Sequence, residues 1–258
     1  MKPKALILQA RGSNRDLDVM EALTLSGAEP IGVPLNHLRS RTTDWHAFQM
    51  LVIPGGFSYA DALGAGKLLA LDLNSYFADE INAFVASGKP VIGICNGFQA
   101  LLKSGILPEG NDRQRASTLT FNTQGHFECR WVTLAPLSQT CIWTKGLNDN
   151  ITCPVAHGEG NFQVSDLTLI NTLSSLDQIA LTYTHPDGSP ANGEYPANPN
   201  GSVLDIAGIC NPQGNVLGLM PHPENHIHPT QHPQWSRDVS GQTGLGLFEN
   251  GIKYAAGL

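Results

Sequence analysis

Short apolar segments alternate with helix-like segments along the first 105 residues. The apolar runs, each six or seven residues long and of buried-strand character, fall at 4–10, 30–35, 50–56 and 89–95. Between and after them, apolar side chains recur at helical spacing over 15–29, 73–88 and 96–105. Parallel neighbours need a crossover connection, and right-handed crossovers put helices on both faces of the sheet. The alternation therefore predicts an α/β fold with a mostly parallel central sheet flanked by helices.

The pattern changes after about residue 113. Strand-like segments follow one another without intervening helices, at 118–136, 141–147, 151–164 and 178–184. Turn-rich stretches separate the later ones, which favours antiparallel pairing. A last strand at 215–224 and a closing helix at 241–257 complete the expected order, and 226–240 is expected to be irregular and exposed. No linker divides the chain, so we expect residues 1–258 to form a single domain with an antiparallel, strand-rich insertion.

Charge and cysteine usage limit the classes of partner. The chain has 258 residues, a formal net charge of −7 and no basic run, which argues against nucleic-acid or anionic-membrane binding but leaves room for a small anionic ligand. The N-terminal apolar run is too short for a signal peptide, and no stretch approaches about 18 apolar residues. The five cysteines are scattered, without a CxxC pair. Free thiols and a cytoplasmic location are expected.

Cys95 lies where a predicted strand meets a predicted helix, in the pattern Gly93-x-Cys95-x-Gly97. Such a strand–turn–helix corner exposes a nucleophile, and the glycines relieve crowding around it. The amino end of a helix also favours a thiolate. The alternative is that Cys95 is a small buried core residue, which is common for free cysteines. Taken alone, the pattern does not decide between the two.

Two other strand ends offer partners for a thiolate. His222 and Glu224 follow the strand at 215–224, and their i, i+2 spacing places both side chains on one side of an extended backbone. A carboxylate that orients an imidazole toward a thiol completes the logic of a catalytic triad. A surface His–Glu pair is the simpler reading of that dipeptide by itself.

The third strand end carries the sequence PGGFSYAD at 54–61. Consecutive glycines let backbone amides approach a substrate, so an oxyanion could be held by one amide from Gly56 or Phe57 and another from Asn96. A plain tight turn is the alternative. The three strand-end motifs together are much more specific than any one of them.

Other histidines need weighing as well. Residues 222–232 hold four of them, His222, His226, His228 and His232, but without zinc-finger or helical spacing and without a cysteine. We therefore expect no metal site and read these as solvated loop histidines. His157 and Glu159, in the glycine-loosened segment HGEGNF, either line the site or only turn the chain.

The motifs GICNGFQ, PGGFSYAD and PHPE together resemble those of class I (triad) glutamine amidotransferases, which have a flavodoxin-like α/β fold. The resemblance extends through FNTQGHFECRWV, PVAHGEGNF, IAGICNPQGNVLGLMPHPE and the closing GLFEN, and so covers nearly the whole chain. It implies that Cys95 attacks the side-chain amide of glutamine to give a γ-glutamyl thioester, with His222 moving the proton and Glu224 orienting it. It also implies an oxyanion hole of Gly56 and Asn96. Glutamine contacts are implied for Phe57, Gln99, Asn122 and Phe127.

Within this family the closest resemblance is to glutaminase subunits of purine biosynthesis. It implies a separate synthetase subunit that binds ATP and Mg²⁺ and aminates formylglycinamide ribonucleotide, together with a small third subunit. No cofactor is expected in this chain, which has no P-loop of its own. Ala60, Gly64 and Asn225 depart from the usual family segments, where glycine, arginine and arginine stand. These departures bear on contacts with the partner more than on the triad.

Two other functions remain open at this point. One is a cysteine hydrolase of γ-glutamyl peptides or related amides, which would use the same corner without a partner. The other is a non-catalytic binding or redox module in which Cys95 is structural or sensing. The His–Glu pair and the glycine turn make this second alternative the weakest of the three hypotheses.

Overall fold

The computed structural model describes residues 2–40, 43–108, 116–237 and 241–258. Its main sheet has nine strands in the order β2-β1-β3-β4-β11-β10-β9-β6-β7. The parallel half consists of β1 (Lys4–Gln9), β2 (Glu29–Pro34), β3 (Met50–Ile53), β4 (Val91–Ile94) and β11 (Val216–Leu219). The predicted parallel core is thus confirmed, with its carboxyl ends at one edge of the sheet.

The antiparallel half continues the same sheet beyond β11. It consists of β10 (Ile206–Cys210), β9 (Ile179–Thr184), β6 (Glu128–Pro136) and β7 (Ile151–His157). These strands are inserted in sequence between β4 and β11, as predicted for the insertion, although no strand was predicted at the position of β10. A separate two-stranded sheet pairs β5 (Ser117–Thr120) with β8 (Asn161–Val164).

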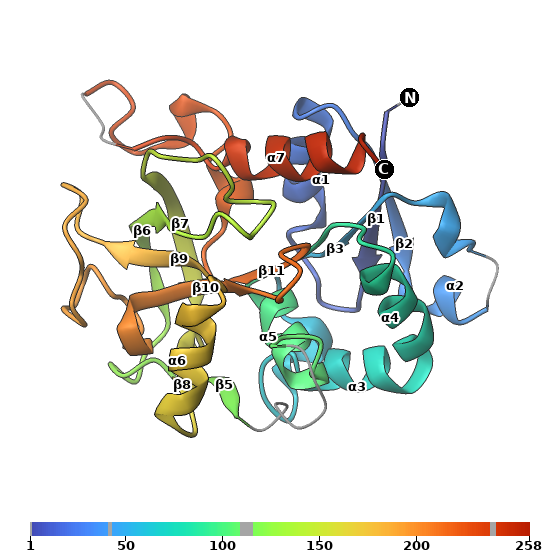
Figure 1. Ribbon diagram of the computed structural model, residues 1–258, viewed down its shortest axis with the longest axis horizontal. Helices are drawn as coiled ribbons and strands as arrows, with labels where there is room; N and C mark the ends of the chain where they lie inside the picture. The colour runs from blue at the N-terminus through green and yellow to red at the C-terminus, as the bar shows by residue number, and fades with distance from the viewer. Residues whose placement is uncertain (1, 41–42, 109–115, 238–240) are drawn as a thin grey trace.

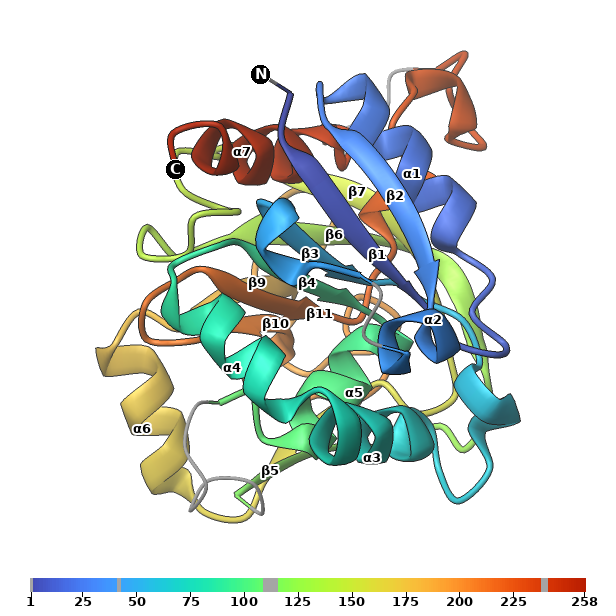
Figure 2. The same cartoon turned by 90° about the vertical axis from the view of Figure 1, so that its right-hand side faces the viewer.

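Helices cover both faces of the parallel half. Figures 1 and 2 show α1 and α7 on one face and α3, α4 and α5 on the other. The helices are α1 (Asp16–Leu25), α2 (Leu35–Arg39), α3 (Lys67–Tyr76), α4 (Ala78–Ala86), α5 (Asn96–Ser104), α6 (Leu167–Ser175) and α7 (Leu245–Ala255). Short 3₁₀ turns lie at Trp45–Ala47, Ser58–Asp61, Val203–Asp205, Pro223–Asn225 and Pro229–Gln231.

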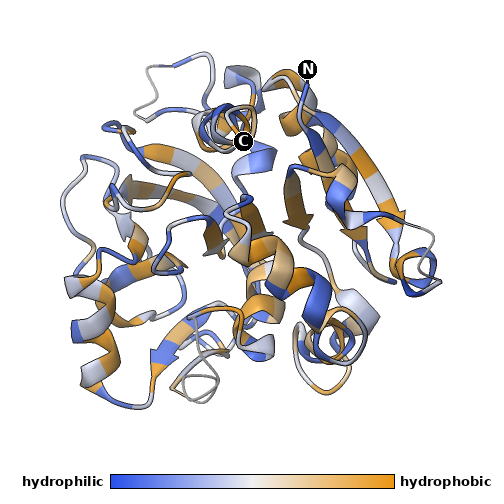
Figure 3. Ribbon diagram, turned by 45° about the vertical axis from the view of Figure 1, so that its right-hand side comes forward, coloured by the Kyte–Doolittle hydropathy of each residue, from blue (hydrophilic) through white to orange (hydrophobic). Residues whose placement is uncertain are grey.

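The core is formed by the central strands. Every residue of β3, β4 and β11 is buried, as expected for parallel strands that are covered on both faces. Figure 3 shows these strands as the most hydrophobic part of the chain, with polar residues concentrated on loops and outer helix faces. Because these strands share one continuous core, the loops that follow them lie at the same edge of the sheet.

Two predicted elements were wrong. The helix predicted at 73–88 is two helices, because Phe77 leaves helical geometry (φ −131°) and packs its buried ring 6.0 Å from that of Trp45. The strand predicted at 141–147 is a series of turns. Ser138 and Asp177 accept hydrogen bonds from backbone amides of residues 139–141, which turns the chain there.

Two further differences concern the second half of the chain. Helix α6 lies between β8 and β9, where no helix was predicted. The stretch 226–240 is also not uniformly exposed: its described part, 226–237, contains His226 and His232, which are buried against the ring of Trp131. Residues 238–240 lie outside the described residues. The aromatic contact comes from β6, almost a hundred residues earlier, and could not be read from local pattern.

Candidate active site

Cys95 lies at a sharp corner between β4 and α5. Its backbone has φ 50° and ψ −103°, a conformation that costs free energy for any residue with a side chain. The two neighbouring glycines are required by packing: a Cβ on Gly97 would lie 2.0 Å from the carbonyl oxygen of Ile53, and one on Gly93 would lie 2.5 Å from Leu101 Cδ1. The close approach of α5 to β3 and β4 therefore holds the strained corner in place.

Gly97→Ala is expected to lower the free energy of unfolding by about 3 kcal/mol or more, because the new methyl group would overlap a backbone oxygen that cannot move away. Gly246→Ala in α7 is a matched control, since its Cβ would meet only the end of the Leu147 side chain, at 3.3 Å. Urea unfolding of both variants measures the difference. Equal stabilities would show that the corner is not tightly packed.

His222 and Glu224 lie at the end of β11 and face Cys95. The Nδ1 atom of His222 is 2.7 Å from Glu224 Oε1, and both side chains are buried. Because Nδ1 is bonded to Glu224, Nε2 is the ring nitrogen left to exchange a proton with Cys95, whose charge acts on the imidazole. Burial opposes protonation of His222, but the negative charges of Glu224 and Cys95 outweigh it and raise its pKa to about 10.

The thiol also lies against the end of β7. Cys95 Sγ donates to the carbonyl oxygen of Ala156 at 3.7 Å. The backbone N–H of His222 donates to Pro154 on the same strand at 2.8 Å. The antiparallel half of the sheet thus supports both members of the Cys–His pair, and its register fixes their separation.

The glycine turn after β3 lies against the imidazole. A Cβ on Gly55 would be 2.7 Å from His222 Cε1. The amide of Phe57 donates to the carbonyl oxygen of Gly12 at 2.9 Å. Phe57 is therefore not available as an oxyanion donor, which favours Gly56 among the two residues considered. Asn96 is the first residue of α5, and the first amides of a helix have no partner within it. The geometry is compatible with Gly56 and Asn96 as the two donors.

The side chain of Asn96 fastens the glycine-turn loop to α5. Its oxygen accepts from the Ser58 amide at 3.2 Å, and its nitrogen donates to Asp61 at 3.2 Å and to Gln99 Oε1 at 3.0 Å. Gln99 in turn donates to the carbonyl oxygen of Glu159 at 2.8 Å. Both polar ends of Gln99 are therefore bonded within the chain, and a direct contact with glutamine stays a prediction.

The other predicted glutamine contacts differ in exposure. Phe57 and Phe127 stack with ring centroids 6.3 Å apart and are half-exposed, so they are accessible to a ligand. Asn122 is buried, and its side chain bonds to His126, His157 and Gly160. The structure thus gives Asn122 a position that holds two loops together, and a direct substrate role for it remains a prediction.

His157 is a buried residue behind the triad whose position the sequence did not reveal. Its Nδ1 is 3.2 Å from Asn122 Oδ1, and its Nε2 is 3.5 Å from the Asn200 side-chain nitrogen. Burial, reinforced by the charge of His222, lowers the pKa of His157 to about 3. It is therefore a neutral imidazole. Gly160 packs directly on the ring of His157. This nearby glycine was the local feature of the sequence that could have indicated a buried ring.

Acid should destabilise the protein partly through His157. Its pKa rises from about 3 when folded to the ordinary value of about 6.5 when unfolded. Between these values only the unfolded chain binds the proton, so this contribution to stability falls as pH falls from about 6.5. From pH 6.5 to 4 the loss amounts to about 3 kcal/mol. Over that pH range, the free energy of unfolding of His157→Gln, measured with urea, is expected to fall by correspondingly less than that of the wild type. His46→Gln, at an exposed position, should follow the wild type. Parallel curves for His157→Gln and the wild type would contradict this.

Comparisons with known proteins agree with this geometry. A family model described as the CobB/CobQ-like glutamine amidotransferase domain matches residues 2–255. Phosphoribosylformylglycinamidine synthase subunit PurQ of Treponema denticola is 53% identical, over 98% of this chain and 99% of the relative. The chain belongs to the PurQ family of glutamine amidotransferases. The PurQ subunit of Dehalococcoides mccartyi is 44% identical, over 98% of each chain.

A solved structure supports the same family. The structure of PurLQS from Thermotoga maritima contains a chain that matches 98% of this one with a TM-score of 0.75 and 32% identity, over 99% of its own length. The predicted class I glutamine amidotransferase fold is thereby confirmed. Two positions that depart from the usual PurQ segments have distinct surroundings: Ala60 lies in a run of left-handed residues from Tyr59 to Asp61, and Gly64 faces the ion pair of Lys103 and Glu159.

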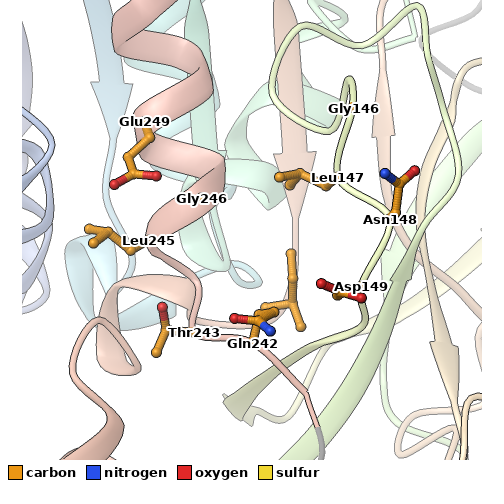
Figure 4. Close-up of a pocket in the computed structure, with 10 residues that line it drawn as sticks. Gly146, Leu147, Asn148, Asp149, Gln242, Thr243, Leu245, Gly246 and Glu249 are labelled. Atoms are coloured by element: carbon orange, nitrogen blue, oxygen red, sulfur yellow. The ribbon is translucent and has the colours of Figure 1, made fainter.

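A cavity lies away from the triad residues. It has a volume of about 450 Å³ and lies between the loop at 146–149 and the start of α7, and Figure 4 shows Asp149 and Glu249 among its lining residues. Among the described residues, no group of three or more metal-ligating side chains is arranged to hold a metal ion. Over the same residues, no helix combines the length and the apolar character needed to cross a bilayer.

Proposed function

We propose that this chain is the glutaminase subunit of phosphoribosylformylglycinamidine synthase and that it releases ammonia from glutamine through Cys95, His222 and Glu224. The single observation that carries the site is that these side chains meet at one edge of the sheet, with His222 Nδ1 2.7 Å from Glu224 and its ring near enough to Cys95 for the charges to interact. The three residues come from two strand ends more than a hundred residues apart in sequence. The family membership independently supports amide chemistry on glutamine.

The geometry supports the following sequence of steps. The Cys95 thiolate attacks the side-chain carbonyl carbon of glutamine, and the oxyanion that forms accepts hydrogen bonds from the amides of Gly56 and Asn96. His222 gives its proton to the leaving nitrogen, and ammonia departs to leave a γ-glutamyl thioester. His222 then takes a proton from water, which attacks the thioester and releases glutamate. Glu224 holds the imidazole in position throughout.

The ammonia is used by partner subunits. Synthetase subunit PurL and small subunit PurS are the partners, in line with the PurLQS assembly of Thermotoga maritima. PurL would hold ATP and Mg²⁺ and aminate formylglycinamide ribonucleotide to formylglycinamidine ribonucleotide, while this chain would need no cofactor of its own. A cytoplasmic site for this step of purine biosynthesis belongs to the proposal.

Reconstitution tests the function. The purified chain, mixed with PurL and PurS from the same source, should support synthesis of formylglycinamidine ribonucleotide with glutamine, whereas PurL and PurS alone should require ammonia. Efficient hydrolysis of γ-glutamyl peptides by the isolated chain, without any gain on mixing, would instead establish a partner-independent hydrolase. Absence of both activities would favour a non-catalytic module.

A further inference from the structure

A second cavity opens at the carboxyl ends of β1 and β2, beside the glycine-turn loop. It has a volume of about 580 Å³ and is lined by Gln9, Ala10, Arg11, Pro34, Leu35, Asn36, Arg39 and Tyr59. Small-molecule pockets commonly have volumes of this order. Ligands of open α/β sheets bind outside the carboxyl ends of the strands. None of the proposed catalytic or oxyanion residues lines this cavity, so it is distinct from the glutamine site.

Two guanidinium groups give the cavity its chemistry. Arg39 on α2 stacks over the Tyr76 ring of α3, with its Cζ 3.4 Å from the ring centroid, and lies 3.9 Å from Asp72. Figure 2 shows α2 and α3 close together at this end of the sheet. Asp72 also accepts a hydrogen bond from Tyr59. One carboxylate thus compensates Arg39, and the stacking leaves the guanidinium edge able to bind a ligand.

Arg11 supplies an uncompensated charge. In the part of the chain that the structure describes, it forms no ion pair with a carboxylate. Arg11, Arg39 and Tyr59 all line this one cavity. The remaining lining residues provide side-chain amides (Gln9, Asn36) and apolar surface (Pro34, Leu35). This combination matches a phosphate group attached to a small hydroxylated body.

We propose that this cavity binds a small phosphate ester of sugar-phosphate size. Arg11 and Arg39 bind the phosphate oxygens, for which the planar guanidinium fork is well suited. The nitrogen of the Gln9 side chain donates to Asp16 at 2.6 Å, so its oxygen is the atom left to accept from a ligand hydroxyl group. The Asn36 amide binds a second hydroxyl group, and Pro34 and Leu35 contact the carbon skeleton. The opposite charge of the cavity in Figure 4, with Asp149 and Glu249, makes that cavity a poor site for the same ligand.

A ligand here would contact the segment that carries the oxyanion turn. The Tyr59 amide donates to Arg11 at 2.7 Å and the Phe57 amide to Gly12 at 2.9 Å. Gly12 packs so closely that a Cβ there would lie 2.1 Å from the Phe57 oxygen. The loops 10–15 and 55–61 therefore behave as one unit. Occupation of the cavity should slow hydrogen exchange in both loops together.

Calorimetric titration of the full chain with ribose 5-phosphate tests the proposal. Saturable binding is expected, with no binding of ribose and weaker binding of inorganic phosphate. Arg11→Gln and Arg39→Gln should each raise the dissociation constant by about tenfold or more. Arg237→Gln, an exposed arginine outside this cavity, should leave it unchanged. Because binding is measured without glutamine, failure here is separable from failure of the proposed function.

Hydrogen exchange gives the second readout. Ribose 5-phosphate should protect amides in 10–15 and 55–61 of the wild type, but not of Arg11→Gln, and should leave α7 unaffected. Absence of saturable binding would overturn the proposal. Equal binding of inorganic phosphate and the ester would reject a phosphate ester as the occupant. An equal effect of Arg237→Gln, or protection at other loops only, would place the ligand elsewhere.

Discussion

Cys95→Ala in the assembled complex is expected to abolish glutamine-dependent synthesis of formylglycinamidine ribonucleotide and to leave ammonia-dependent synthesis at the wild-type rate. The reason is that, in the proposed mechanism, the Cys95 thiol forms the covalent bond to glutamine, whereas the partner's chemistry starts from free ammonia. The loss should reach the detection limit, since alanine cannot form the thioester. Parallel assays with glutamine and with ammonium chloride measure the two rates.

A matched control separates this effect from damage to the complex. Cys129 is exposed on β6, so Cys129→Ala should retain both activities. Retained ammonia-dependent activity in Cys95→Ala shows that the complex still assembles. Glutamine-dependent activity that survives in this variant would remove Cys95 from the mechanism.

Glu224→Gln is expected to reduce the glutamine-dependent kcat by about 10²–10⁴-fold. In the wild type, burial opposes protonation of His222, but Glu224 and Cys95 together raise its pKa to about 10. Without the carboxylate the imidazolium loses one of its two stabilising charges, and the pKa of His222 should fall. NMR titration of the His222 ring, beside steady-state rates at constant pH, measures both effects.

The control for this variant is another His–Glu pair. Glu21 lies 3.5 Å from His228 at the surface, where both side chains are about half-exposed. Exposed ion pairs contribute little to stability, and this one is not part of the triad. Glu21→Gln should therefore change kcat by less than about twofold. A Glu224→Gln enzyme with wild-type kcat and an unchanged His222 titration would show that the buried carboxylate neither orients nor stabilises the imidazole.

The strand ends could be predicted from sequence because their logic is local. An apolar run followed by Gly-x-Cys-x-Gly, or by His-x-Glu, marks a position at the edge of a parallel sheet, and the topology brings such positions together. In the structure, the strand ends that carry Cys95 and His222 lie near enough for the two side chains to interact. That residues 1–258 form one domain, and that Gln99 and Asn122 touch glutamine, stay predictions.

The parts that could not be predicted depend on distant partners. Asn122 and His157 are 35 residues apart in sequence and are joined by a side-chain hydrogen bond. The Asn200 side chain lies against the other ring nitrogen of His157. The break at Phe77 depends on Trp45, and the buried histidines at 226 and 232 depend on Trp131. In each case a tertiary contact overrides the local pattern. Periodicity alone carries no information about such contacts.

Covalent labelling is the most direct test of the central claim that Cys95 is an activated nucleophile which recognises glutamine. The chain, in complex with its partner subunits, is treated with a diazo-ketone analogue of glutamine, digested and mapped by mass spectrometry. The account predicts one labelled peptide, with the adduct on Cys95, and protection by excess glutamine. Labelling of exposed Cys129 instead, or of no cysteine at any pH, would contradict it.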